Sequence, residues 1–490
     1  MTTAPGGVQR RTAIGLAPLS YAQERMWFLN QLEPANSAYS GVRATRWKGP
    51  LNREALERTV QEIRRRHEVL RTRFPMGAAG PAQEIEPDDS IPLPLIDLSS
   101  GGPVAAMVEA RTWLAAEGRR PFELTREAPF RASLLRVGQD DHVLALTVHH
   151  IAFDRWSRSV LRRELGLLYA AFAGGRPSPL PEPPVQYQDY ADWQRERMRS
   201  EQVVRALDYW RGRLRGAPAV LPLPSDRPRQ ASPAYLGRQA GFTVPEGVVE
   251  ALDRLGRRER VTLFMTLLAA FKALLARVTG RTDLVVGVPV AGRTTLELSD
   301  LIGCFTNTLV LRTDGSGNPT FRELLHRVRH VALEGYAHQE LPFERLVREL
   351  QPERRLGQHP LFQVLFNYLD FPAEPVNPPG IEVEELEIPS DAALVDLGVD
   401  IRRTAQSLTC TITGDAGMFE APTIGRLARE YLASLESFAN DPECRISALA
   451  AIGHGVAPDQ TDLLVRELEQ MTDDEAERLL AAEVRSGIDE

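Results

Sequence analysis

Two adjacent histidines, His149 and His150, follow an apolar run over residues 143–148 that is rich in strand formers and predicts a buried strand. Beyond them, apolar residues recur at helical spacing and end at a pair of glycines, which predicts a helix that Ser157 is well placed to cap. A connection between a strand and a helix is a place where a rigid scaffold presents reactive side chains. Histidine is also the side chain best suited to proton transfer near neutral pH.

Four interpretations of this stretch stay open on the residues alone. The histidines are ordinary residues at a strand end, or they bind a metal, although no cysteine or second histidine cluster with ligand spacing lies near. A Ser-His-Asp hydrolase is disfavoured because no G-x-S-x-G turn is present. The fourth interpretation is a histidine that acts on a substrate brought from elsewhere, with Asp154 as an internal anchor.

The composition bounds the class of protein. The chain has 490 residues, 43% of them hydrophobic and 25% charged, as in an ordinary globular protein of two or three domains. Its three cysteines are too few and scattered for a disulfide scaffold, and residues 1–11 contain no apolar signal segment. We therefore expect a protein of the reducing cytoplasm.

The net charge of −8 is concentrated at one end of the chain. Residues 456–490, the acidic tail, hold eleven acidic and three basic residues, so the rest of the chain is close to neutral. This balance disfavours nucleic-acid binding. The tail pattern predicts two short helices, over 461–470 and from Thr472 onward, which either pack loosely on the body or dock a partner.

Capping residues and helix breakers predict the order of elements around the histidines. Ser20 and Asn52 each precede an amphipathic helix, and Thr320 opens a third helix with a capping box. Proline-rich stretches at 177–184 and 222–233 predict connections, the first of them between domains. Because strands and helices mix without strict alternation, we expect an α/β protein with mixed sheets in two halves.

Taken in order, seven stretches resemble the motifs of the condensation domains of nonribosomal peptide synthetases, over about residues 16–449. Both histidines of the third motif are present, whereas heterocyclising relatives have aspartates there. The flanking motifs resemble the condensing type, and most closely the subtype that joins an L-configured donor to an L-acceptor. The stretches are residues 20–27, 66–72, 149–154, 187–193, 302–308, 338–344 and 358–362.

The resemblance implies two chloramphenicol-acetyltransferase-like lobes arranged as a V, with an active-site tunnel between them. Together with the sequence pattern it predicts a disordered segment over 1–13, an N-terminal lobe over 14–185, a C-terminal lobe over 186–455 and the acidic tail over 456–490.

The resemblance also implies the reaction. A donor acyl thioester on one carrier protein's phosphopantetheine arm would meet an amine on a second carrier, and an amide would form. The partners would be donor and acceptor carriers and other synthetase modules, with no nucleic acid or membrane. No cofactor bound by the domain itself is expected. An ester-forming condenser and a catalytically silent recruitment platform are the alternatives.

Individual roles are carried over from the family's motifs. His150 would accept a proton from the amine or only orient the amine, and His149 would fix the loop. Asp154 would face away from the substrate and pair with Arg293 of the other lobe. Asn367 is expected at the tunnel.

Arg155 departs from the family, which has glycine after the motif aspartate. The guanidinium would turn outward, block the tunnel, or gate it until a loaded carrier displaces it. Trp156 and Ser157, which follow Arg155, are expected beside the same passage.

Overall fold

The computed structural model describes residues 7–12, 15–87, 91–229, 235–353, 357–370, 377–386, 388, 392–404 and 407–449. By its internal contacts the chain divides into one compact unit, Met1–Ile446, and a second unit, Ser447–Glu490. The two helices predicted for the acidic tail lie outside the described residues.

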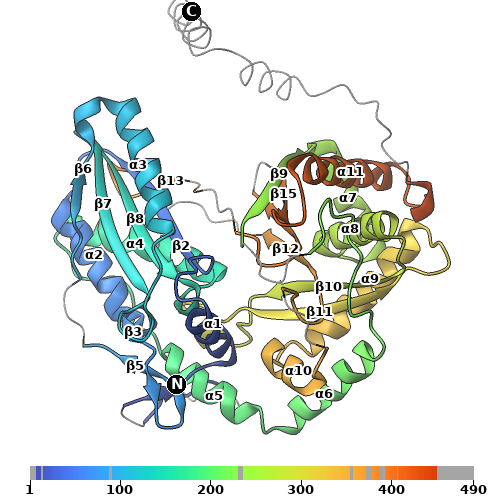
Figure 1. Ribbon diagram of the computed structural model, residues 1–490. Helices are drawn as coiled ribbons and strands as arrows, with labels where there is room; N and C mark the ends of the chain where they lie inside the picture. Colours follow the sequence, from blue (N-terminus) through green and yellow to red (C-terminus); the bar gives the residue numbers. More distant parts are fainter. Residues whose placement is uncertain are drawn as a thin grey trace, which may run out of the picture. The chain divides into compact units, whose positions relative to one another are not determined.

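A five-stranded sheet carries the histidines at the end of its central strand (Figure 1). β8 (Asp141–His149) is buried along its last seven residues, which explains why its sequence is continuously apolar. It pairs on one side with β7 (Phe130–Gly138), which pairs with β6 (Leu95–Asp97) in parallel. On its other side β8 pairs with β2 (Ser40–Lys48). The strand predicted over residues 143–148 is therefore confirmed.

The edge of this sheet comes from far along the chain. β13 (Glu382–Leu386) adds antiparallel to β2, and Ile381 just before it joins the core beneath the sheet. Leu298, Leu301, Ile302 and Phe305 belong to the same core. The predicted boundary at residue 185 does not anticipate this exchange, because cross-strand pairing over such a separation leaves no local sequence signal.

A second, larger sheet contains six strands. Its order is β11-β10-β12-β14-β15-β9, and β12 lies parallel to both of its neighbours. Helices α8, α9 and α11 pack with one another and against this sheet. The strands are β9 (Gly237–Val244), β10 (Asp283–Val290), β11 (Asn307–Asp314), β12 (Val364–Asp370), β14 (Leu397–Arg403) and β15 (Leu408–Asp415).

The remaining elements surround these two sheets. A small sheet is built from β1 (Ala17–Pro18), β3 (Thr72–Arg73), β4 (Met76–Gly77) and β5 (Gly80–Ile85). The helices are α1 (Tyr21–Leu32), α2 (Arg53–Arg66), α3 (Pro103–Gly118), α4 (Arg155–Ala173), α5 (Tyr187–Arg197), α6 (Glu201–Leu214), α7 (Glu246–Glu259), α8 (Leu263–Thr279), α9 (Phe321–Ala337), α10 (Phe343–Leu350) and α11 (Ala421–Asn440). Single 3-10 turns are η1 (Glu68–Arg71), η2 (Ser99–Gly101), η3 (His150–Ala152), η4 (Leu296–Leu298) and η5 (Ile446–Ala448).

Most of the predicted helix starts are confirmed, but one is wrong. Ser20, Asn52 and Thr320 each cap the helix expected of them. Ser157, in contrast, is not the cap of α4. The cap is Asp154, whose carboxylate accepts the backbone N–H of Ser157. A carboxylate three residues earlier accepts this bond in the usual capping geometry, so the helix begins at Arg155.

The prediction of disorder over residues 1–13 is wrong for residues 7–12, the part that the structure describes. Val8 is buried in the core beneath the five-stranded sheet. Arg11 pairs with Asp192 at 2.9 Å, and its backbone N–H donates to Asp189. One apolar anchor and one ion pair suffice to order a short segment whose composition looks unstructured.

Helix α8 is buried along most of its length, although it contains a lysine. Lys272 is fully buried, and its ammonium donates to the Leu311 carbonyl and the Thr313 hydroxyl, both at 2.7 Å. Burial, then the charge of Arg213, lowers the pKa of Lys272 to about 7, which Asp283 only partly offsets. Among the described helices none alone is long and apolar enough to span a membrane, and α7 with α8 qualifies only as a pair bent by 105°.

Lys272→Met should remove a pH dependence of stability. The pKa of Lys272 is lower in the folded chain than in the unfolded chain, so the unfolded chain binds more protons between about pH 7 and pH 10. The free energy of unfolding should therefore rise with pH there, by up to about 1.4 kcal/mol per pH unit. Urea unfolding of parent and Lys272→Met across this range measures the difference. An equal pH dependence of the free energy of unfolding in parent and Lys272→Met would contradict this prediction. So would the same loss of pH dependence in the surface variant Lys48→Met.

Candidate active site

His149 is the structural member of the pair. The chain leaves β8 at His149, and the single turn η3 follows. The His149 ring is buried, packs edge-on against Phe122 at 6.1 Å, and accepts the backbone N–H of Ile151 at its Nδ1. Burial lowers the pKa of His149 to about 3. The ring therefore stays neutral and fixes the turn that presents His150.

His150 is held in one tautomer. Its backbone N–H donates to the Tyr39 carbonyl at 2.7 Å, and its ring Nδ1 lies 2.5 Å from the Phe153 carbonyl. A carbonyl only accepts, so Nδ1 carries the proton and Nε2 keeps its lone pair. Burial is the main cause that lowers the pKa of His150, while the bond to Phe153 and the charge of Asp154 act against it. A neutral imidazole with a bare Nε2 can accept a proton.

The Asp154 carboxylate is buried and fully occupied by the protein. It accepts the Ser157 backbone N–H at 2.8 Å, the Ser157 hydroxyl at 2.7 Å and the Phe305 backbone N–H at 3.1 Å. Arg293 Nη2 lies 3.1 Å from its Oδ1. The side chain therefore has no lone pair left for a substrate, and it joins the start of α4 to the loop before β11.

Arg293 is the partner that the resemblance implied for Asp154. Both side chains are buried, with 2% and 0% exposure. Its other Nη donates to the carbonyls of Leu298 and Leu301, and the guanidinium lies over the Phe305 ring at 4.1 Å. A desolvated ion pair with this many hydrogen bonds fixes geometry, although its net stabilisation is small.

The loop of residues 302–307 bonds the Asp154 carboxylate and the start of α4. The sequence alone assigned this loop no role. The Gly303 carbonyl accepts the Asp154 backbone N–H, and the Gly303 N–H donates to the Ser157 hydroxyl. The Tyr187 hydroxyl donates to the Cys304 carbonyl at 2.6 Å. His67 accepts the Ile302 N–H while its other ring nitrogen bonds Glu164. Motifs far apart in sequence therefore hold one loop.

Close packing explains why this loop contains glycine. A Cβ at Gly303 would lie 2.2 Å from the Tyr187 ring. At Gly292, φ is +65°, and a Cβ there would lie 1.9 Å from the Phe305 carbonyl oxygen. Neither position has room for a side chain, so the approach of the loop to α5 and to Arg293 depends on these glycines.

Arg155 reaches the six-stranded sheet. Its Nη2 lies 3.4 Å from Asp400 Oδ1 on β14, and that oxygen also accepts the Asn367 side-chain amide at 2.8 Å. The Arg155 side chain keeps 33% exposure. Asn367 and Arg155, which were both expected at the passage, are thus brought together by Asp400, a residue that sequence reasoning missed.

Trp156 and Ser157 turn toward the protein and away from Arg155. The Trp156 indole N–H donates to the Ser299 carbonyl at 2.9 Å. The Ser157 hydroxyl is buried among Asp154, Gly303 and Arg293. The expectation that Ser157 lines a passage is therefore wrong, because the residue is fully buried and its hydroxyl is used to bond Gly303, Asp154 and Arg293.

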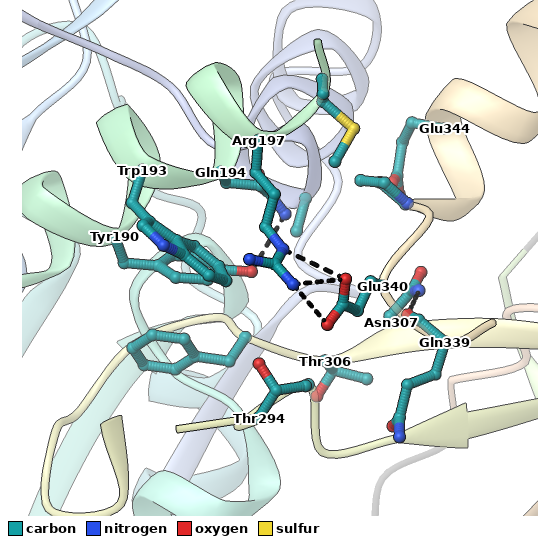
Figure 2. Close-up of a pocket in the computed structure, with 15 residues that line it drawn as sticks. Tyr190, Trp193, Gln194, Arg197, Thr294, Thr306, Asn307, Gln339, Glu340 and Glu344 are labelled. Carbon is teal, nitrogen blue, oxygen red and sulfur yellow. Dashed lines mark hydrogen bonds and ion pairs between the residues drawn. The ribbon is translucent and has the colours of Figure 1, made fainter. Parts of the chain in front are cut away.

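A small cavity lies beside this loop but does not include the histidines. Figure 2 shows its lining, in which Arg197 pairs with Glu340 at 2.9 Å close to Tyr190 and Trp193. Its volume is about 40 Å³, enough for water only. Within the described residues, no cluster of His, Cys, Asp or Glu side chains is arranged to hold a metal ion.

Fold and site together define a mixed α/β protein that presents one neutral histidine on a braced loop. A family model described as "Condensation domain" matches residues 13–455. The chain therefore belongs to the condensation domain family of nonribosomal peptide synthetases. Solved condensation domains share its fold, that of the chloramphenicol acetyltransferase-like superfamily.

Individual relatives agree with this assignment. The chain is 40% identical over 435 residues to chondramide synthase cmdD of Chondromyces crocatus, covering 89% of this chain and 11% of that one. It is 40% identical to a component of the linear gramicidin synthase of Brevibacillus parabrevis, covering 91% and 9%. Among solved structures, the X-domain in its complex with OxyB from teicoplanin biosynthesis matches with a TM-score of 0.82 at 29% identity, covering 91% and 98%. The chain thus spans about a tenth of the length of these synthetases.

Asp154→Asn should destabilise the fold strongly, because it leaves the buried Arg293 guanidinium without its counter-charge. We expect the free energy of unfolding to fall by about 3–5 kcal/mol. Denaturant unfolding measures this loss.

The matched control is Asp97→Asn, which breaks the exposed pair with Arg136. Exposed pairs contribute little, so this variant should unfold like the parent. Equal losses in the two variants would mean that the buried pair does not have the bracing role assigned to it.

Proposed function

We propose that the chain catalyses amide formation between a donor acyl thioester and an acceptor amine, each carried on the phosphopantetheine arm of a carrier protein. The substrates would meet in a passage beside His150. The acceptor nitrogen attacks the thioester carbonyl, the C–S bond breaks, and the lengthened chain remains on the acceptor carrier. The subtype that joins two L-configured residues fits the motifs best.

The observation that carries this proposal is the His150 imidazole with a bare Nε2. It would take the proton that the amine loses and return it to the departing thiolate. A thioester is already activated, so no covalent enzyme intermediate is needed. Alignment of two tethered reactants supplies up to about 7–11 kcal/mol of the barrier, and a positioned base adds about 10²–10⁴-fold.

His150→Gln should lower the rate of product formation by about 10²–10⁴-fold, because the proton acceptor is lost while the ring's volume is largely kept. Intact-mass detection of the product on the acceptor carrier measures this rate. The melting temperature of the variant serves as the control for folding. Product formation at the parent rate would contradict a role for His150 in proton transfer.

Arg155 would gate the passage. Its contact with Asp400 is long, and Asp400 is already bonded to Asn367, so a loaded arm would displace the guanidinium at little cost.

Arg155→Gly should change kcat/KM for bulky donors by about tenfold, or about 1.4 kcal/mol of activation free energy, because the passage is then open without displacement. The measurement compares donors of increasing size on the same carrier. The control is Arg163→Gly on the same helix, where an exposed arginine pairs with Asp300. Equal rates for parent and Arg155→Gly with every donor would contradict the gate.

A non-catalytic recruitment platform is the second candidate. It is favoured by the likeness to the X-domain, which was solved in complex with OxyB, and by the arginine in place of glycine. Product formation that depends on His150 would favour the enzyme over the non-catalytic platform. Replacing the acceptor amine by a hydroxyl tests the ester-forming alternative in the same assay.

A further inference from the structure

Arg43 on β2 is not among the residues that hold the two histidines, although its guanidinium lies beside the histidine loop. Its Nη1 is 3.3 Å from the position that a Cβ would occupy at Gly41, so the side chain leans back along the strand. In the register of β2 and β8, Gly41 lies opposite Val148 and Ser40 opposite His149. The guanidinium also lies 5.7 Å from the centre of the Phe153 ring.

The charge of the Arg43 guanidinium is only partly compensated. Within the described residues no carboxylate is at ion-pair distance from it, and its Nε is buried without a hydrogen-bond partner. Burial, then the charges of Arg158 and Arg155, lowers the pKa of Arg43 to about 10, and Glu385 only partly offsets this shift. Burying a guanidinium without a paired carboxylate destabilises the protein, and a bound anion would offset this cost.

The neighbouring arginines differ in how fully they are engaged. Arg158 makes a two-pronged pair with Glu385 on β13. Among the described residues, the one ion pair of Arg155 is its long contact with Asp400. Two guanidiniums with spare donors, Arg43 and Arg155, therefore flank the loop of His150.

We propose that Arg43 and Arg155 bind a carboxylate carried by the acyl substrate, so that this chain selects an acyl group with an acidic side chain or terminus. The proposal rests on the proposed function, because it places that acyl group beside His150. Planar, forked guanidiniums match carboxylate oxygens in pairs, and an anion between them relieves their mutual repulsion.

The phosphate of the pantetheine arm is the other anion that could reach an arginine. The pantetheine chain separates this phosphate from the thioester by its whole length. Arg43 lies against Phe153, whose carbonyl holds the His150 ring. A group at this place meets the acyl end of the arm, which favours the carboxylate.

Binding of three small probes tests the proposal without turnover. The probes are aminopantetheine acylated with a succinyl group, its neutral succinamyl counterpart, and 4′-phosphopantetheine without an acyl group. Isothermal titration of the full chain should give about tenfold tighter binding of the succinyl probe than of the succinamyl probe, as expected for charge-assisted hydrogen bonds.

Arg43→Gln should abolish this preference, and Arg43→Lys should restore part of it. Arg46→Gln is the matched control, because Arg46 lies on the same strand and is paired with Asp141. Retention of the preference by Arg43→Gln, or its loss in Arg46→Gln, overturns the proposal.

Equal binding of the succinyl and succinamyl probes by the parent overturns the proposal, as does the absence of binding. If only the binding of 4′-phosphopantetheine depends on Arg43, the site binds the phosphate of the arm, and the proposal is likewise overturned. Because amide formation is measured separately on loaded carriers, failure of the proposed function is distinguishable from failure of this inference.

Discussion

The buried carboxylate of Asp154 is the interaction on which the site depends. It caps α4, bonds the backbone of the loop at Phe305, and pairs with Arg293. Because all its acceptor sites are used inside the protein, it performs no chemistry of its own. Its effect is to fix the start of α4 relative to the strand end that carries His150, whose ring keeps an unprotonated Nε2.

The motifs of the family converge on this carboxylate through the loop of residues 302–307. His67 holds Ile302, Tyr187 holds Cys304, and Asn307 bonds the chain just before and at the start of α10. Most motif residues are therefore braces. His150 differs from these residues in keeping an unprotonated Nε2, and under the proposal the arginines near it would select the acyl group.

Local signals carried much of the fold. The apolar run of β8, the caps at Ser20, Asn52 and Thr320, and the buried helix α8 follow from periodicity and capping chemistry. The strand exchange of β13 was not anticipated, because its partner lies over three hundred residues away. The same reason hid Asp400 and Arg43 as members of the site. The placing of Asp154 and Arg293 together came from the resemblance, and nothing in their spacing would have given it.

The central claim is that the His150 ring is neutral at pH 7, with its proton on Nδ1 and a bare Nε2. Nitrogen NMR of histidine-labelled protein, with the His150 signals assigned by their absence in His150→Gln, measures both properties directly. The account predicts a protonated Nδ1, an unprotonated Nε2, and titration below the ordinary histidine pKa of 6.5. A proton on Nε2, or an imidazolium at pH 7, would contradict it.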